Sequence, residues 1–348
     1  MEDLCERFPL LSKMVFENLD DQSLVKVKES SQKINNHLQN ERLYWIRRIK
    51  KYVEYFKKFA DAWKKVIDKT PVKIVRILAI TVESYFNYYQ TQLHPLHVAA
   101  HRGHLDLCKY IVEKTGDFNP KHDDGLTALH IAAAQGHTEV YRFILNNVDD
   151  KNPADNEGDT PYNCAVKKYH LDMAMFIIEN LDDKNPRNHL NDGSTPLHMA
   201  AMYGYYDICQ LIIGKIEDKN PVDNIGWTPL HLAAGDGHLE ICKLIIDKIE
   251  VKNPVDHEGL TPLHQAAENG HLDICQLIVD KIEDKNPVDD DGWTPLHYAA
   301  SEVHMDICKM IASYLDDKNP RTNLGTTPKE LINQYVKKVQ KEADDLFQ

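Results

Sequence analysis

The sequence lacks the features that mark a membrane protein, a secreted protein or an enzyme. No apolar run approaches the roughly 20 residues that a membrane-spanning helix requires. The start, MEDLCERFPLL, is acidic where a secretory signal is basic. The sequence contains no glycine-rich phosphate loop, no pair spacing typical of zinc sites and no isolated nucleophile context. We therefore expect a cytoplasmic or nucleocytoplasmic protein that is not an enzyme, has no cofactor and enters no membrane.

The length and the charge distribution indicate more than one part. The 348 residues exceed one simple core, which favours two domains or a repeat array. Residues 1–92 carry 17 Lys/Arg and 12 Asp/Glu, whereas the remainder carries 24 and 42, a formal charge of −18. Because an acidic surface repels phosphates and attracts basic patches, we expect no nucleic-acid partner and a protein target with a basic surface.

One motif recurs at a fixed interval. DNIGWTPLHLAA at 223–234 returns as DDDGWTPLHYAA at 289–300, and its threonine recurs in steps of 33, with one step of 35. The positions are Thr127, Thr160, Thr195, Thr228, Thr261, Thr294 and Thr327. A period of 33 with T-P-L-H-x-A resembles the ankyrin repeat family over about 94–340, in eight copies. The resemblance implies an all-α solenoid of paired helices with β-hairpin loops.

The chemistry of each repeat agrees with paired helices. Thr228 suits a helix N-cap, and Pro229 fits the first helical position, where no amide donor is needed. Gly237 then ends the first helix at low cost in a left-handed conformation. The second helix repeats apolar residues on one stripe, namely Ile241, Leu244, Ile245 and Ile249. One repeat cannot bury this stripe alone, so stacking is required.

Histidine and cysteine occupy repeat positions, which argues against reactive sites. Adjacent stacked helices lie about 8–10 Å apart, too far for equivalent histidines to share a metal ion or cysteines a disulfide. We therefore predict hydrogen-bonded structural imidazoles, no metal, and buried thiols in a reducing compartment. One histidine series is His97, His130, His198, His231, His264 and His297, and the other is His104, His137, His170, His238, His271 and His304. The cysteine series is Cys108, Cys209, Cys242, Cys275 and Cys308.

Two departures from the repeat pattern and one recurring loop residue carry further predictions. Tyr169 and Val303 stand where glycine ends the first helix, so these corners should be strained. The segment 187–194 is two residues longer than its equivalents, so that hairpin tip should protrude. A loop lysine recurs in each repeat, and we predict a solvated face for Lys151, Lys184, Lys219, Lys252, Lys285 and Lys318.

The resemblance also implies where a partner binds. In ankyrin proteins, the residue before the threonine and the pair that ends the first helix face the concave binding side. The candidates here are Leu126, Gln135, Lys168, Met202, Tyr203, Trp227, Asp236, Leu260, Asn269, Trp293 and Glu302. Exposed aromatic residues are enriched at binding hot spots, which favours this interpretation of the two tryptophans. The alternative is that each tryptophan packs against its own hairpin and binds nothing.

The amino-terminal segment, 8–45, predicts a compact three-helix unit. It contains Phe8-Pro9, then Leu19-Asp20 before Ser23-Leu24, and it ends in Leu43-Tyr44-Trp45. These pairs resemble the F-box family, although Ile34 lies near the place of that family's second-helix tryptophan. An F-box implies docking to the adaptor of a cullin-based ubiquitin ligase, with contacts carried over to Phe8, Pro9, Leu10, Val15 and Leu24. The alternative is a helical cap that closes the open end of the solenoid.

The sequence therefore predicts four segments and two possible functions. The segments are an F-box-like unit at 1–46, a helical linker or degenerate capping repeat at 47–92, ankyrin repeats at 93–328 and a C-terminal capping helix at 329–348. The first function is substrate recognition for an SCF-type cullin ubiquitin ligase. The second is an ankyrin scaffold with no ubiquitin link. We expect a monomer in either case.

Overall fold

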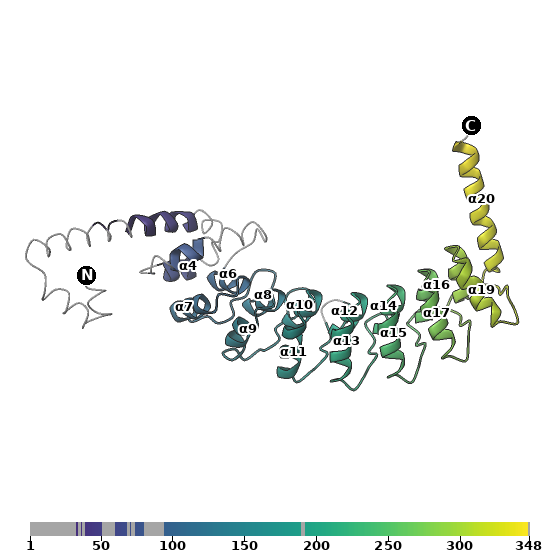
Figure 1. Ribbon diagram of the computed structural model, residues 1–348, viewed down its shortest axis with the longest axis horizontal. Helices are drawn as coiled ribbons and strands as arrows, with labels where there is room; N and C mark the ends of the chain where they lie inside the picture. Colours follow the sequence, from purple (N-terminus) through teal and green to yellow (C-terminus); the bar gives the residue numbers. More distant parts are fainter. Residues whose placement is uncertain are drawn as a thin grey trace, which may run out of the picture. The chain divides into compact units, whose positions relative to one another are not determined.

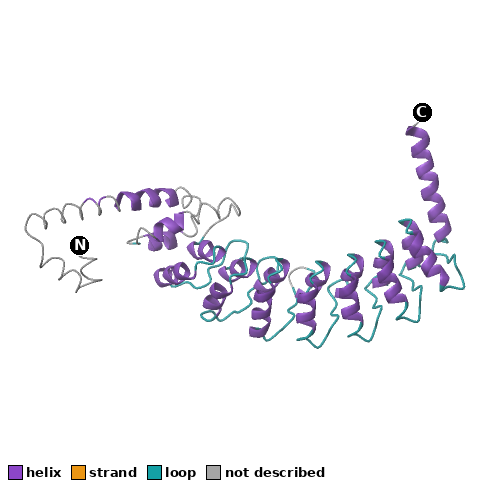
Figure 2. Ribbon diagram, in the orientation of Figure 1, coloured by secondary structure: helices purple, strands orange, loops and turns teal. Residues whose placement is uncertain are grey.

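A computed structural model describes residues 33, 36, 39–50, 60–67, 70, 74–79, 94–188 and 192–346. The chain divides into two compact units, Met1–Asp123 and Asp124–Gln348. Every regular element in the described ranges is a helix, and no strand is assigned there (Figure 2). The predicted hairpin loops are present as tight turns, closed by bonds such as the one from Asp223 N to Trp227 O (2.8 Å), and are too short to form strands.

The described part of the first unit contains a helix over 39–50, α4 (Ala60–Ile67), a helix over 74–79, α6 (Pro95–His101) and α7 (Leu105–Thr115). Helix α4 contacts both α6 and α7, and Trp63 of α4 is fully buried. The guanidinium of Arg42 donates to the carbonyls of Ile67 and Thr70, at 3.0 and 3.1 Å. The predicted adaptor contacts Phe8, Pro9, Leu10, Val15 and Leu24 lie outside the described residues.

The second unit is a stack of two-helix layers (Figure 1). First helices contact first helices of the neighbouring layers, and second helices form a parallel row. The first helices are α8 (Ala128–Ala134), α10 (Pro161–Lys167), α12 (Pro196–Met202), α14 (Pro229–Gly235), α16 (Pro262–Glu268) and α18 (Pro295–Ser301). The second helices are α9 (Thr138–Leu145), α11 (Leu171–Asn180), α13 (Tyr206–Ile213), α15 (Leu239–Ile246), α17 (Leu272–Val279) and α19 (Met305–Ser313), and α20 (Pro328–Leu346) ends the stack. This arrangement confirms the predicted solenoid.

Each layer forms for the reasons that the motif supplies. The hydroxyl of Thr228 accepts a hydrogen bond from His231 N at the start of α14, and Pro229 occupies the first turn. The alanines at the centre of α14 are fully buried, which lets neighbouring first helices approach closely. In α15 the side chains of Ile241 and Ile245 and the thiol of Cys242 face the core, as predicted. The other two residues of the predicted stripe differ, since Leu244 is half-buried and Ile249 lies past the end of the helix.

Histidines join the layers in both directions along the stack. In five members of the first series Nδ1 accepts from the threonine amide of its own layer, and Nε2 bonds a carbonyl of the next hairpin. The pairs are His130 with Asp159, His198 with Trp227, His231 with Leu260, His264 with Trp293 and His297 with Thr326. In the second series Nε2 bonds a carbonyl of the preceding layer, His170 with Ala134, His238 with Met202, His271 with Gly235 and His304 with Glu268. The predicted structural role of these imidazoles is confirmed.

The prediction that the loop lysines form a solvated face is wrong for four of them. Their ammonium groups fold back onto carbonyl oxygens at the end of a second helix. Lys219 donates to Ile213 O at 2.7 Å and also to Ile216 O. The same fold-back occurs in other layers, from Lys184 to Leu181 O, from Lys252 to Ile246 O and Ile249 O, and from Lys285 to Val279 O and Ile282 O. A cation at a helix C-terminus satisfies its last carbonyls and opposes the negative end of the dipole.

The last helix differs from the predicted cap. Thr327 and Glu330 form reciprocal bonds at its start, since Glu330 N donates to the threonine hydroxyl and Thr327 N to the glutamate carboxylate. Helix α20 then contacts α18. Tyr335 and Val336, near the middle of α20, are exposed, so only the start of the helix covers the stack. Residues 189–191 lie outside the described part, so the predicted protrusion at 187–194 stays a prediction.

Candidate functional site

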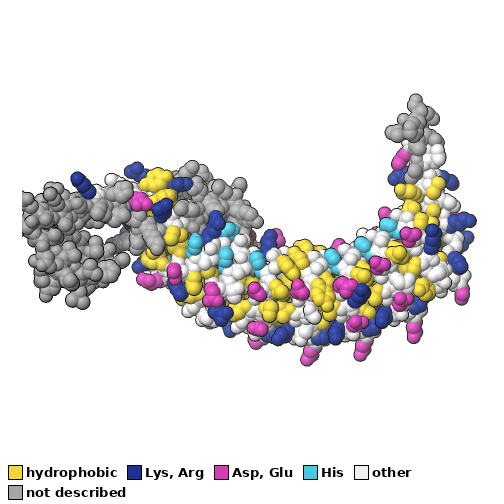
Figure 3. Space-filling view, in the orientation of Figure 1, with side chains coloured by type: hydrophobic (Ala, Val, Ile, Leu, Met, Phe, Trp, Pro, Cys, Tyr) yellow, Lys and Arg dark blue, Asp and Glu magenta, His cyan; other side chains and the backbone are white. Residues whose placement is uncertain are grey.

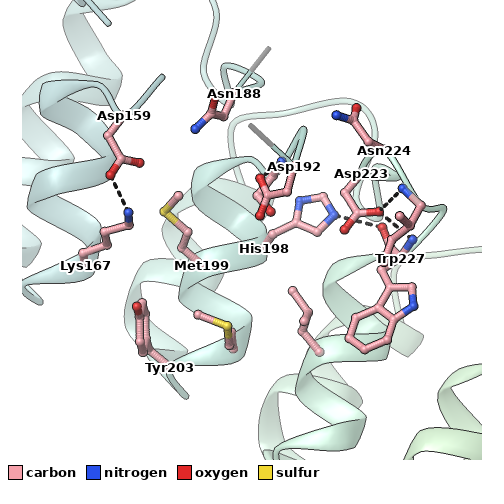
Figure 4. Close-up of a pocket in the computed structure, with 14 residues that line it drawn as sticks. Asp159, Lys167, Asn188, Asp192, His198, Met199, Tyr203, Asp223, Asn224 and Trp227 are labelled. Carbon is pink, nitrogen blue, oxygen red and sulfur yellow. Dashed lines mark hydrogen bonds and ion pairs between the residues drawn. The ribbon is translucent and has the colours of Figure 1, made fainter. Parts of the chain in front are cut away.

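A cleft of about 590 Å³ opens on the first-helix side of the stack, between α10, α12 and α14. Figure 4 shows Asp159 and Lys167 from the third repeat on one side and Trp227 from the fifth on the other, with Met199, His198 and Tyr203 of the fourth between them. The cleft therefore draws on three consecutive layers. Its lining comprises Asp159, Lys167, Asn188, Asp192, Ser194, His198, Met199, Met202, Tyr203, Asp223, Asn224, Ile225, Trp227 and Leu232.

Trp227 is held by two successive hairpins. Its amide donates to Asp223 Oδ1 at 2.8 Å, and its indole Nε1 donates to Asp256 Oδ2 of the next hairpin at 2.9 Å. The ring stacks on His231, with centroids 6.4 Å apart. The tryptophan thus packs against its own hairpin, as the alternative interpretation predicted, and it also presents a fixed, half-buried ring to the cleft. A rigid aromatic ring loses little conformational entropy when a partner binds.

An ion pair closes the opposite side of the cleft. Lys167 Nζ lies 2.5 Å from Asp159 Oδ2, and the lysine side chain is 34% exposed. Partial burial opposes the charged form of Lys167, but its bond to Asp159 and the charge of that carboxylate prevail and raise its pKa. The pair can hold its geometry while a partner approaches.

Acidic groups outnumber basic ones in the lining, where Asp159, Asp192 and Asp223 face one lysine. Burial lowers the pKa of His198, and its Nε2 donates to Trp227 O at 3.1 Å, so this imidazole is neutral. Methionine and aromatic side chains supply an apolar floor. Such a surface suits a protein segment that combines a basic side chain with apolar neighbours.

Cys164 of α10 lies beside this region and is half-buried. Burial and the charge of Asp159 raise the pKa of Cys164 to about 12, so the group is a thiol at neutral pH. Among the residues that the structure describes, no cluster of three or more His, Cys, Asp and Glu side chains could hold a metal ion. The described helices include none that is both long enough and apolar enough to cross a membrane.

The structure gathers only some of the predicted partner-binding residues. Met202, Tyr203 and Trp227 line the cleft together. Trp293 packs in its own layer against His297 and Tyr298, with ring centroids 5.9 and 5.3 Å apart. The remaining candidates lie elsewhere on unit 2, either half-buried, as Leu126, Gln135 and Leu260, or exposed, as Lys168, Asp236, Asn269 and Glu302.

Two further cleft residues occupy the slots that the sequence predicts to face a partner, although they are not among the candidates named above. Asp159 occupies the same slot as Trp227, two repeats earlier, and Lys167 belongs to the pair that ends the first helix of the repeat that departs most from the motif, TPYNCAVKKYH. A charged residue in an otherwise neutral or apolar slot was the available signal. Met199 gives no such signal, because a residue inside the motif is expected to be buried in the core. Its side chain is indeed buried to 8% exposure, and it still lines the cleft.

Comparison with known proteins agrees with the layered fold. A family model described as ankyrin repeats (3 copies) matches residues 68–155, 96–188, 147–223, 174–255, 197–289 and 247–324. These overlapping matches span 68–324, well over half of the chain, and leave 8–45 uncovered. No curated protein matches the chain significantly.

Proposed function

Because this chain belongs to the ankyrin repeat family, whose members serve as protein–protein interaction modules, we propose that its first-helix side binds a protein partner with a basic surface. The observation that carries the proposal is the cleft between α10, α12 and α14, where Trp227, Met202 and Tyr203 meet beside three carboxylates. Buried aromatic anchors at the centre of an interface supply most of its binding energy. The carboxylates would accelerate encounter with a basic partner.

The overall charge supports the same partner chemistry. Residues 93–348 carry a formal charge of −18, and acidic side chains are spread along the visible face of the repeat layers (Figure 3). Long-range attraction of this kind raises the association rate and weakens as salt is added, because the Debye length shortens. The target is therefore expected to be a basic protein segment with at least one apolar side chain for the cleft.

We further propose that the chain is the substrate receptor of an SCF-type cullin ubiquitin ligase. The support is the motif in 8–45, with Phe8-Pro9 at its start and Ser23-Leu24 after the turn. Such a protein needs no chemistry of its own, since holding a target beside the ligase raises the effective concentration of one for the other. Phe8, Leu10 and Leu24 would carry the adaptor contact.

The alternative is a scaffold whose amino-terminal segment only caps the repeats. One observation favours it. Arg42 donates to the carbonyls of Ile67 and Thr70, and the guanidinium of Arg76 lies 5.7 Å from the centroid of the Trp45 ring. These contacts tie the end of the segment to the helices that follow, as a capping element requires.

One capture experiment tests both proposals. The tagged full-length chain is recovered from cells beside a Phe8→Asp/Leu24→Asp double variant and a Trp227→Ser variant, whose serine copies Ser194 in the same slot. The native chain should recover a cullin adaptor and a salt-sensitive basic target. The Phe8→Asp/Leu24→Asp variant should lose the adaptor and keep the target. The Trp227→Ser variant should lose the target and keep the adaptor.

A matched control is Trp293→Ser, which changes the same slot outside the cleft and should keep both partners. Absence of a cullin adaptor from the native sample would exclude the ligase proposal and leave the scaffold. Retention of the target by Trp227→Ser, or its loss in Trp293→Ser alone, would place the binding site away from the cleft.

A further inference from the structure

Most layer junctions of the second unit share a Gly–His pair. After four of the first helices a glycine has a positive φ, and the histidine of the next layer packs directly on it. A Cβ at Gly136 would lie 2.8 Å from the ring of His170, and one at Gly237 2.6 Å from that of His271. The same approach recurs for Gly204 with His238 and for Gly270 with His304. No side chain fits at these glycines while the imidazole stays in place.

One junction replaces both members of the pair at once. Tyr169 takes the place of the glycine with φ 55°, and Tyr205 takes the place of the next histidine. Their rings meet at 4.7 Å, and the hydroxyl of Tyr169 donates to Asp207 Oδ2 at 3.1 Å. Tyr203 also stacks on Tyr205, with centroids 5.6 Å apart. We call Tyr169, Tyr203, Tyr205, Tyr206 and Asp207 the tyrosine patch.

The patch retains strain that the fold does not require. A non-glycine residue in the left-handed region costs about 1–2 kcal/mol, and four neighbouring junctions avoid this cost with glycine. Val303 is the other non-glycine residue with positive φ in the described part, with φ 63°, and no ring contact is found there. Strain that persists beside a cluster of unusual side chains points to a functional use of that cluster.

The patch is open to a partner. Tyr169 is 47% exposed, Tyr203 43% and Tyr206 39%. A groove of about 350 Å³ lies beside Tyr169, lined by Gly136, His170, Leu171, Asp172 and Met173. Exposed carboxylates of Asp172 and Asp207 flank the rings. The neighbouring cations are the exposed Lys168 and Lys167, which interacts with Tyr203 and is neutralised by its ion pair with Asp159. Aromatic faces with adjacent carboxylates attract a planar cation and repel phosphate.

We propose that the tyrosine patch docks an arginine side chain of a protein partner. The guanidinium stacks on an outer ring face, and its N–H groups donate to the Asp207 carboxylate, which can accept more bonds than the one from Tyr169. Arginine fits better than lysine because its planar group can stack and donate at the same time. The inference rests on the chain being an interaction module, but it adds a second contact beyond the cleft, which borders the patch at Tyr203.

The test replaces Tyr169 and Tyr205 by the glycine and histidine that stand at the other junctions. A Tyr169→Gly/Tyr205→His variant of the full chain should be at least as stable as the native protein, because it removes the strain and rebuilds the Gly–His contact. The probes are three Gly/Ser decapeptides that carry one arginine, one lysine or one glutamine. Ring resonances of ε-¹³C-tyrosine report binding. The arginine peptide should shift the signals of Tyr169 and Tyr203, the lysine peptide should shift them less, and the glutamine peptide should leave them unchanged.

Val303→Gly is the matched control, since it relieves the same kind of strain at another junction and should keep arginine binding intact. Asp207→Asn changes only an exposed carboxylate and should weaken arginine binding by about tenfold, the loss expected for one charge-assisted bond. Equal shifts with the glutamine peptide, or unchanged arginine binding in both patch variants, would overturn the proposal.

Failure of the patch is distinguishable from failure of the cleft. Trp227→Ser lies outside the patch, so it should bind the arginine peptide normally while losing the captured target. Loss of peptide binding in that variant would contradict the assignment of arginine to the patch. If the tyrosine patch binds the arginine peptide but the native chain captures no target, this inference holds although the proposed function of the cleft fails.

Discussion

At the scale of the residue, the histidine inside each T-P-L-H motif acts as a neutral bridge. In the fifth repeat, Nδ1 of His231 accepts from Thr228 N at 3.1 Å, while Nε2 lies 3.2 Å from Leu260 O in the next layer. Protonation would turn the Nδ1 acceptor into a donor facing Thr228 N, and only the hydroxyl of Thr228, at 2.9 Å, could then accept from it. It would also place a charge among buried groups. The motif is therefore more stable while its imidazole stays uncharged.

This requirement predicts a loss of stability in mild acid. Burial lowers the pKa of His231 and His264 from the ordinary 6.5 to about 4. The unfolded chain binds these protons first, so the free energy of unfolding should be largest above pH 6.5 and should fall steadily toward pH 4. The loss should reach about 3 kcal/mol for each histidine. Denaturant unfolding between pH 7.5 and pH 4 measures it.

A single substitution isolates one histidine. His264→Asn copies Asn163, which fills this slot in the third repeat, and it should lower stability at pH 7 while flattening the acid dependence. The exposed His257 provides the comparison, since His257→Gln should leave both quantities unchanged. An acid slope that His264→Asn leaves as steep as before would show that other groups carry it.

At the scale of the element, the second helices depend on a side chain from the loop that follows them. Helix α15 ends at Ile246, and the ammonium of Lys252 returns to bond its carbonyl at 2.6 Å and that of Ile249. Each carbonyl at a helix end needs a partner, and water or a cation can supply it. The recurring lysine therefore joins a helix to its loop, and the K-N-P segment that contains it in each repeat is part of the layer.

We predict that Lys252→Met destabilises the chain by about 1 kcal/mol, because methionine keeps the length of the side chain and removes the charge and the donors. Lys248→Met changes an exposed lysine of the same loop and should have little effect. Hydrogen exchange of the amides over 245–252 and the thermal midpoint measure the difference. If Lys252→Met and Lys248→Met have the same hydrogen exchange and the same thermal midpoint, the fold-back of Lys252 does not stabilise the chain.

At the scale of the whole molecule, layers of the second unit contact mainly their immediate neighbours. Helix α14 contacts α12 and α16, and α18 contacts α16 and α20. The stability of such an array is close to a sum of layer terms and neighbour terms, so a weak layer acts locally. A defect in the middle divides the stack, whereas one near the end loosens only that end.

Two equivalent substitutions test this locality. Leu230 in α14 and Leu296 in α18 fill the same slot and are both buried, so Leu230→Ala and Leu296→Ala should each cost about 2–5 kcal/mol in their own layer. Leu296→Ala should raise hydrogen exchange only in α18–α20. Leu230→Ala should raise it in α12–α17 and broaden the unfolding transition. Uniform loss of protection across 124–348 in both variants would show that the stack unfolds as one unit.

The sequence by itself determined the layers of this protein. The period, the helix caps, the helix starts and the buried cysteines follow from local rules repeated every 33 residues. The tyrosine at position 169, where other repeats have glycine, was enough to predict strain. These features depend on φ/ψ preferences and on which face of a helix is apolar. Both are determined by residues close together in the sequence. The family match confirmed the repeat, while the segment 8–45 lies almost wholly outside the described residues and stays a prediction.

Only the tertiary structure decided which side chains meet across layers. Asp159 and Trp227 line one cleft although 68 positions separate them, and Tyr169 meets Tyr205 because the next layer brings it there. The lysine fold-back depends likewise on the path of a whole loop. The physical reason is that the offset and rotation between stacked helices come from the packing of the complete core. A one-dimensional pattern fixes each layer but leaves that packing undetermined.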